Sequence, residues 1–138
     1  MPTQVNTNQI KNLAVTMPKM SSGWQTWTNI APTGYLTMTY TAVTIVEAKY
    51  VVVGKICYCK AIYHGTTGGT AQPRLTATLP VTAVGYSTGP VNLDDAGQMI
   101  GVAQTNGDTS LTIYKYNGAS WSLGTLRYVV LSIFYEIA

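Results

Sequence analysis

Residues 47–63, Glu-Ala-Lys-Tyr-Val-Val-Val-Gly-Lys-Ile-Cys-Tyr-Cys-Lys-Ala-Ile-Tyr, constrain the fold more than any other part of the chain. β-Branched and aromatic residues dominate the stretch, and both classes of residue favour strands. Gly54 divides it in two. The pattern therefore predicts a hairpin made of the strands Thr44–Val52 and Lys55–Tyr63.

The second strand of this hairpin has two different faces, because successive side chains of a strand point to opposite sides of a sheet. One face carries Cys57, Cys59, Ala61 and Tyr63, and the other carries Ile56, Tyr58, Lys60 and Ile62. Neither face is uniformly polar. We therefore expect the first face to pack in a core, and we name Ile56, Tyr58 and Ile62 as candidate intersubunit residues.

Low charge also favours an oligomer. Charged residues form only 9% of the chain, whereas globular proteins average about 25%. With 46% hydrophobic residues, some apolar surface is expected to be buried against other subunits.

Further strands follow from alternation and from turn residues such as the Asn-Gly pairs at 106–107 and 117–118. These predicted strands are Tyr35–Thr41, Arg74–Leu79, Gln98–Gln104, Thr109–Tyr116, Ala119–Leu123 and Leu126–Ile137. The glycine-rich stretch His64–Pro73 is interpreted as a loop, and Thr82–Gly97 as a long polar connection. No helix is predicted.

About eight short strands of this kind are typical of an antiparallel β-sandwich, here jelly-roll-like. Residues 24–138 are predicted to form this all-β head domain. Residues 1–23 contain two prolines and no clear period, which indicates a short extended N-terminal arm. Five apolar side chains in the arm need a partner to cover them, so they are candidate docking residues: Ile10, Leu13, Val15, Met17 and Met20.

Several function classes are disfavoured by composition. The eight Lys and Arg residues never form a basic run, so a nucleic-acid partner is not expected. No segment approaches the ~20 apolar residues of a membrane span, so membrane insertion is not expected. The N-terminal residues also lack the basic and apolar regions of a secretory signal.

Candidate catalytic and metal-binding groups do not form a recognisable set. His64 is the only histidine, and no spacing selects a pair of carboxylates. Cys57 and Cys59 would lie roughly 6.5–7 Å apart in a strand, at the limit for a disulfide, and are interpreted as small buried side chains. We predict a non-enzymatic protein without cofactor or metal. A cation at Asp94 and Asp95 is left as an open alternative to turn-capping roles.

Aromatic usage is skewed, with ten Tyr and three Trp against one Phe. Tyr and Trp combine apolar area with a polar tip, which suits interfaces and saccharide stacking. Tyr86, Tyr116 and Trp121 fall in or near predicted loops and strand ends, so they are candidate ligand-facing aromatics. Core packing is the alternative for each of them.

An ordered set of motifs resembles the C-terminal head domains of bacteriophage fibre proteins. The set consists of Trp27-Thr28, Ala48-Lys-Tyr50, Val53-Gly-Lys-Ile-Cys-Tyr58, a Gly-Thr loop and Ala77-Thr-Leu-Pro-Val-Thr-Ala83. Upstream, Asn8-Gln-Ile-Lys-Asn-Leu-Ala-Val-Thr-Met-Pro-Lys-Met20 is similar to one unit of the repeats found in phage fibre shafts. The resemblance covers residues 24–138, and the single upstream unit extends it.

The resemblance implies a homotrimeric virion protein that acts by attachment. It would be assembled in the host cytoplasm and carried on the virion surface. An arm of about 22 residues spans about 70 Å, which favours a capsid decoration or short head fibre docked on the major capsid protein or another virion structural protein. The runner-up hypothesis is the receptor-binding tip of a tail fibre that recognises a host cell-surface glycan.

Overall fold

The computed structural model of the protein describes residues 23–138. The predicted attachment arm and its candidate docking residues, Ile10, Leu13, Val15, Met17 and Met20, lie outside the described residues. The boundary of the head domain at residue 24 therefore stays a prediction.

The described residues form nine strands and no helix, which confirms the predicted all-β class. In chain order the strands are β1 (Gln25–Thr26), β2 (Thr33–Gly34), β3 (Met38–Val53), β4 (Ile56–Gly69), β5 (Arg74–Thr78), β6 (Tyr86–Asp94), β7 (Gln98–Asn106), β8 (Ser110–Lys115) and β9 (Gly124–Glu136). Within residues 23–138 there is accordingly no apolar helix of membrane-spanning length.

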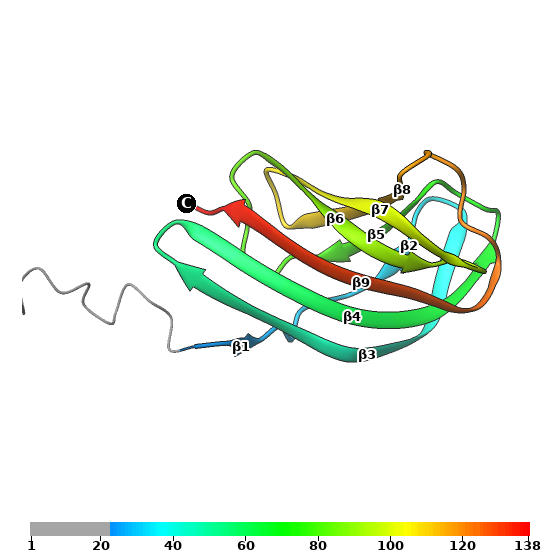
Figure 1. Ribbon diagram of the computed structural model, residues 1–138, viewed down its shortest axis with the longest axis horizontal. Helices are drawn as coiled ribbons and strands as arrows, with labels where there is room; N and C mark the ends of the chain where they lie inside the picture. Colours follow the sequence, from blue (N-terminus) through cyan, green and yellow to red (C-terminus); the bar gives the residue numbers. More distant parts are fainter. Residues whose placement is uncertain (1–22) are drawn as a thin grey trace, which may run out of the picture.

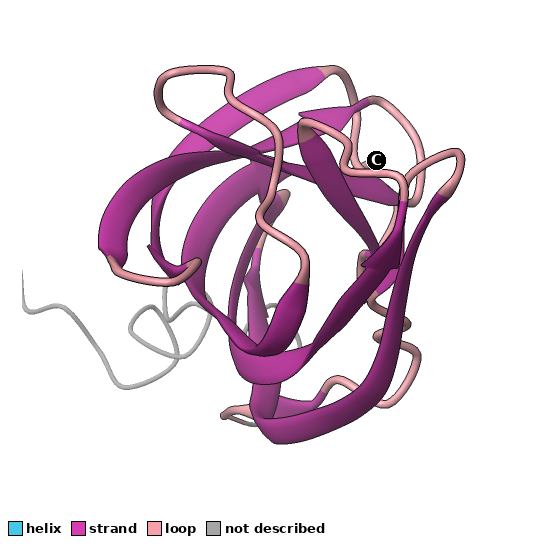
Figure 2. Ribbon diagram, turned by 90° about the vertical axis from the view of Figure 1, so that its right-hand side faces the viewer, coloured by secondary structure: helices cyan, strands magenta, loops and turns pink. Residues whose placement is uncertain are grey.

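All nine strands belong to one antiparallel sheet in the order β1-β3-β4-β9-β6-β7-β8-β5-β2. The sheet curls on itself, so that its strands surround a common interior when the molecule is viewed end-on (Figures 1 and 2). β2 at one end of the strand order leads directly into β3 near the other end. A turn in which the Met38 amide donates to the Tyr35 carbonyl makes this connection.

The predicted hairpin is confirmed as β3 and β4, joined at Gly54 and Lys55. Gly54 has φ +61°, a left-handed conformation that glycine adopts without steric cost. Val53 pairs with Ile56 across the turn. The amide of Ile137 donates to the Lys55 carbonyl, so the C-terminal residues lie against this turn (Figure 1).

β4 continues to Gly69, so the interpretation of His64–Pro73 as a loop is wrong for its first half. A glycine in this part of the strand leaves room for a neighbouring side chain. A Cβ atom on Gly65 would lie 2.7 Å from Cζ of Tyr40. The ring of Tyr40 lies over Gly65, and its hydroxyl donates to the Arg127 carbonyl at 2.8 Å.

The prediction of an irregular connection over Thr82–Gly97 is also wrong, because β6 occupies its centre. β6 pairs with β7 along its whole length and with β9 from Val91 to Asp94. Pro90 lies just before the β9 pairing begins, where the missing N–H of a proline is tolerated. Conversely, Ala119–Leu123, predicted as a strand, forms no regular structure.

The core lies inside the curled sheet. Cys57, Cys59, Ala61 and Tyr63 of β4 are fully buried there, which confirms the predicted inward face. Both cysteines are free thiols. Burial raises the pKa of the Cys59 thiol and of the Tyr63 phenol well above their ordinary values. These groups are therefore neutral and serve packing.

Candidate interaction surface and groove

The outward-pointing side chains of β3, β4, β9, β6 and β7 form one surface, here called the outer face. Its composition follows from the pairing of β4 with β9, which sets Tyr58 opposite Phe134 and Ile62 opposite Val130. Alternation sends the neighbours of these residues into the core. Ile56, Tyr58 and Ile62, the candidate intersubunit residues, all lie on the outer face.

Three aromatic rings cluster at the end of the outer face where β1 begins. Phe134 stacks on Tyr58 with ring centroids 4.4 Å apart, and Trp24 lies 5.3 Å from Tyr58. Trp24 is 47% exposed and Phe134 is 64% exposed. We call Trp24, Tyr58 and Phe134 the aromatic cluster. Exposed apolar clusters of this kind mark interaction sites in soluble proteins.

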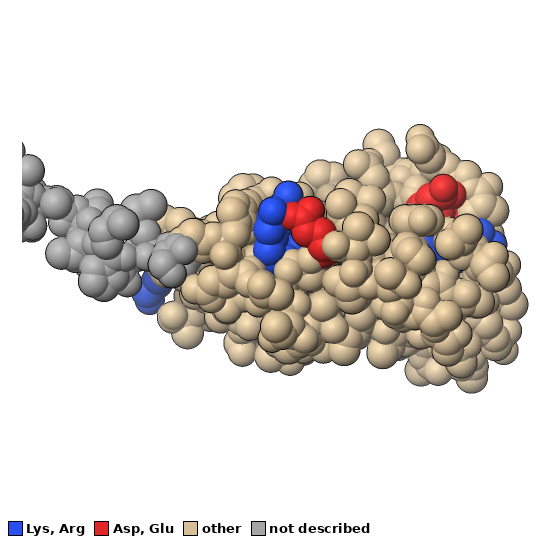
Figure 3. Space-filling view, turned by 90° about the horizontal axis from the view of Figure 1, so that it is seen from below, with Lys and Arg blue, Asp and Glu red and all other residues tan. Residues whose placement is uncertain are grey.

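Charges beside the aromatic cluster partly neutralise one another, because one carboxylate faces two ammonium groups. Glu47 forms ion pairs with Lys49 and, at 3.2 Å, with Lys60. Hydrogen bonds from the two ammonium groups lower the pKa of the Glu47 carboxyl, and both ammonium groups lie within 6 Å of the Trp24 ring centroid. Charged side chains occupy only small parts of the side of the molecule shown in Figure 3. Uncharged side chains therefore predominate on this side of the molecule.

A second feature, a polar groove, lies near the turn that joins β6 to β7. Strand pairing lines up Tyr128, Asp94 and Gln98 in one row across the sheet, and Val130, Asn92 and Ile100 in the next. The short side chains of the central strand, Asn92 and Asp94, stand between taller ones on both sides. The result is a hollow of about 620 Å³, lined by these six residues together with Leu93 and Met99.

Most polar groups in the groove have no partner within the described part of the chain. Oδ1 of Asp94 accepts a hydrogen bond from the amide of Gly97 at 3.0 Å. For residues 23–138, no hydrogen bond involves Oδ2 of Asp94, the amide groups of Asn92 and Gln98, or the Tyr128 hydroxyl. His64 lies against the Tyr128 ring, with centroids 4.6 Å apart. The groove thus offers free hydrogen-bonding groups on strands whose register fixes their positions.

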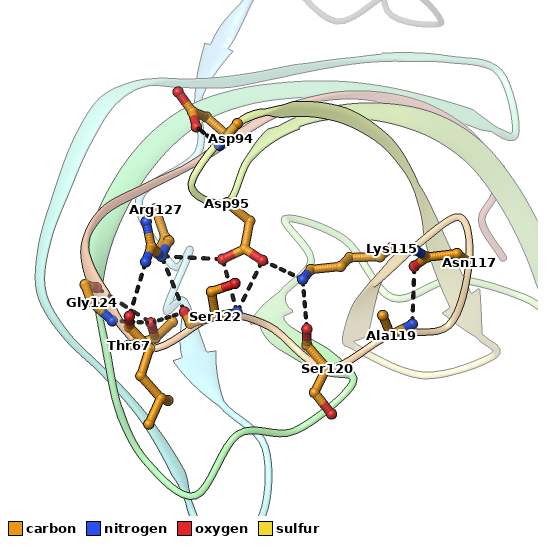
Figure 4. A network of polar contacts seen from close by, with 12 residues as sticks. Thr67, Asp94, Asp95, Lys115, Asn117, Ala119, Ser120, Ser122, Gly124 and Arg127 are labelled. Carbon is orange, nitrogen blue, oxygen red and sulfur yellow. Dashed lines mark hydrogen bonds and ion pairs between the residues drawn. The ribbon is translucent and has the colours of Figure 1, made fainter.

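A buried ion network lies directly behind the groove (Figure 4). The fully buried Asp95 carboxylate forms ion pairs with Lys115 and, at 3.1 Å, with Arg127. The amide of Ser122 donates to both carboxylate oxygens at 3.0 Å. Carbonyl groups of Ser120, Ser122 and Leu123 accept the remaining hydrogen bonds of the two cations. Asp95 and Arg127 each adjoin a groove residue in sequence, so the network holds the backbone beneath the groove.

The contacts of Asp94 and Asp95 concern the alternative in which these two carboxylates bind a cation together. Asp94 caps a turn and Asp95 pairs with two side-chain cations, so the two carboxylates serve separate roles. Over residues 23–138, no three His, Cys, Asp or Glu side chains are grouped so that they could hold a metal ion.

The three candidate ligand-facing aromatics do not form one site. Tyr86 and Tyr116 are 74% and 71% exposed, but they lie beside opposite ends of β7, next to Asn106 and Ile100. Six residues along a strand separate them by about 20 Å. Trp121 is 1% exposed, so its prediction as a ligand-facing residue is wrong. Its amide donates to the Gln72 carbonyl, and its ring covers Lys115 of the ion network.

Comparison of the chain with protein-family models, with curated proteins and with solved structures gave no significant match. The interaction surface and the groove therefore have to be interpreted from their own chemistry.

Sequence reasoning did not identify Asn92, Gln98 or Tyr128 as site residues, and it considered Asp94 only for a cation site shared with Asp95. A signal was present in the alternation Val91-Asn-Leu-Asp94, in which polar side chains share one face. That alternation indicates a strand, and recognising it would have placed Asn92 and Asp94 side by side on a surface.

Proposed function

We propose that the protein is a bacteriophage virion structural protein, a homotrimeric capsid decoration or short head fibre. In this proposal the N-terminal arm docks on the major capsid protein or on another virion structural protein. The curled sheet serves as the jelly-roll-like sandwich head that is displayed on the virion surface. The protein acts by attachment and not by catalysis.

The aromatic cluster is the observation that carries this proposal. Its rings are exposed to water. A partner that covered them would remove apolar surface from water, which would stabilise the complex. The described chain starts at Gly23, next to Trp24 of the cluster. The arm therefore joins the head at the apolar end of the outer face. A second copy that covers this end would bring the arms of neighbouring subunits together, as docking through a trimer requires.

Deletion of residues 1–20 is expected to abolish incorporation into virions and to leave a folded head, because the core described above uses none of these residues. Incorporation is measured by immunoblotting of purified particles, and folding by circular dichroism. Deletion of residues 1–8 is the matched control, because it shortens the chain but keeps all five candidate docking residues. Full incorporation of the longer deletion would refute the docking arm.

Replacing Phe134 with arginine is expected to convert the trimer into monomers. The substitution places a charge in the centre of a surface that association would desolvate, which costs several kcal/mol when the charge has no partner. Light scattering coupled to size-exclusion chromatography gives the mass. Tyr116→Arg is the control, because Tyr116 is similarly exposed but adjoins Ile100, which lies in the row of Val130 and not in that of Phe134. A trimer that survives Phe134→Arg would exclude the cluster as the subunit contact.

The second candidate function is the receptor-binding tip of a tail fibre that recognises host cell-surface glycan. The polar groove favours it, because its side-chain amides, the Tyr128 hydroxyl and one oxygen of the Asp94 carboxylate have no hydrogen-bond partner within residues 23–138. Under this alternative the purified protein blocks phage adsorption to host cells in a concentration-dependent assay. Under the leading proposal adsorption is unchanged.

A further inference from the structure

We infer that the polar groove binds one neutral hexopyranose unit of a glycan, with Asn92, Asp94 and Gln98 as hydrogen-bonding residues and Tyr128 as the aromatic wall. This inference goes beyond virion assembly, and it names a ligand class and a location for the receptor-binding alternative. It concerns the isolated protein and holds for a capsid or a tail location.

The first argument is the set of functional groups. Two carboxamides, one carboxylate oxygen and one phenol offer both donors and acceptors, and a sugar ring presents hydroxyl groups that are donors and acceptors at once. The planar amide and carboxylate groups can each engage two neighbouring hydroxyls. The hollow of about 620 Å³ lies within the range of small-ligand sites in proteins.

The second argument is charge. Asp94 contributes a carboxylate, and none of the residues that line the groove is Lys or Arg. The two cations behind the groove, Lys115 and Arg127, are held by Asp95 and by main-chain carbonyls. An acidic sugar would therefore meet like charge without a compensating partner, which disfavours binding. Neutral sugars avoid this penalty.

The third argument is the apolar part of the lining. Val130 and Ile100 lie on either side of Asn92 in one row of the groove. In the next row, Tyr128 and Gln98 lie on either side of Asp94. A pyranose ring has C–H groups on its faces that pack on such surfaces, while its hydroxyls reach the polar groups between them. The contact with His64 restrains the Tyr128 ring.

The groove is also preorganised. Asn92 and Asp94 lie on β6, which is paired on both sides, and Tyr128 lies on β9, which is flanked by β4 and β6. The ion network fixes the chain immediately after Asp94 and immediately before Tyr128. The backbone positions of the groove residues are thus fixed before binding, so a ligand has to order only their side chains, which limits the entropic cost.

The test uses the full chain and saturation-transfer NMR with the methyl glycosides of glucose, galactose, mannose and N-acetylglucosamine, and with methyl glucuronide as the anionic probe. At least one neutral glycoside is expected to bind, and the glucuronide to bind at least tenfold more weakly. Absence of binding by all the neutral glycosides, or equal binding of the glucuronide, would overturn the inference.

Two substitutions locate the site. Gln98→Leu is expected to weaken binding about tenfold, equivalent to the ~1.4 kcal/mol of one hydrogen bond to a ligand. Gln104→Leu, the same change on the same strand and face but outside the groove, leaves affinity unchanged. Asp94→Asn keeps the oxygen that caps the turn and removes the charge, so it is expected to improve glucuronide binding. Equal losses from Gln98→Leu and Gln104→Leu would exclude the groove.

The outcomes separate this inference from the proposed function. Loss of glycoside binding in Gln98→Leu leaves incorporation into virions and the trimer mass unchanged. Deletion of residues 1–20 alters incorporation but not glycoside binding.

Discussion

Replacing Asp95 with alanine is expected to lower the free energy of unfolding by about 3–5 kcal/mol. The carboxylate is fully buried and is the acidic partner of both Lys115 and Arg127. Without it, two cations stay close together in a poorly solvated place, and the Ser122 amide loses its acceptor. The loss therefore exceeds that of a surface ion pair, which contributes at most about 1 kcal/mol.

Urea denaturation followed by tryptophan fluorescence, at fixed protein concentration, measures this effect. Asp95→Asn tests the charge alone, and it is expected to lie between the wild type and Asp95→Ala. Asp108→Ala is the matched control, because the exposed Asp108 carboxylate only caps a turn by accepting from the Ser110 amide at 2.7 Å. A loss below about 1 kcal/mol for Asp95→Ala, similar to that of Asp108→Ala, would contradict the role of the network.

Replacing Trp27 with alanine is expected to cost about 3–5 kcal/mol, the usual range for deletion of a buried large aromatic ring. Trp27 is 1% exposed. Its indole Nε1 donates to the Thr78 carbonyl at 3.0 Å, and its amide donates to the Ala48 carbonyl. One residue thereby connects β3 with the end of β5, strands that lie near opposite ends of the strand order.

Trp27→Phe separates the two contributions, because it keeps most of the packing and removes the indole hydrogen bond. We expect it to cost about 1–3 kcal/mol, since the part-buried Thr78 carbonyl loses the indole donor. Tyr86→Ala removes an exposed ring and is expected to change stability by less than about 0.5 kcal/mol. Thermal and urea unfolding of the three variants measure their order of stability. Equal stability of Trp27→Ala and Tyr86→Ala would show that the Trp27 contacts do not stabilise the fold.

The sequence was most informative where pairing is local. The hairpin of β3 and β4 and the strands β5, β7 and β8 follow from alternation and from turns of a few residues, and all were predicted. β6 was missed although its pairing with β7 is local, because Gly89, Pro90 and the pair Asp94-Asp95 are typical of a connection and masked the alternation. Gly65 was misread for a different reason. Its role is to make room for Tyr40, and only the packed structure reveals that contact.

The candidate sites divide in the same way. Alternation alone placed Ile56, Tyr58 and Ile62 on one face of a strand. The partners that complete the aromatic cluster come from β9 and from the segment before β1, so the sequence could not reveal the cluster. The groove depends on the register of three strands, and a shift of one residue would have turned Asn92 and Asp94 inward. Exposure of Trp121 was inferred from its place near predicted loops and strand ends, whereas tertiary packing buries it.

β3 has a further consequence for how copies of the chain can meet. The strand is sixteen residues long, and within residues 23–138 the pairing with β1 is at Lys49 and Tyr50, next to a bond from the Trp27 amide to the Ala48 carbonyl. An open strand edge invites edge-to-edge polymerisation, and many proteins prevent this with lysines or with irregular backbone. In this chain two register shifts, between Thr41 and Thr44 and between Ile45 and Glu47, interrupt the edge, and Ala42 has φ +50°. The chain has few charged residues, so the distorted backbone, more than charged side chains, disfavours the addition of another strand along this edge.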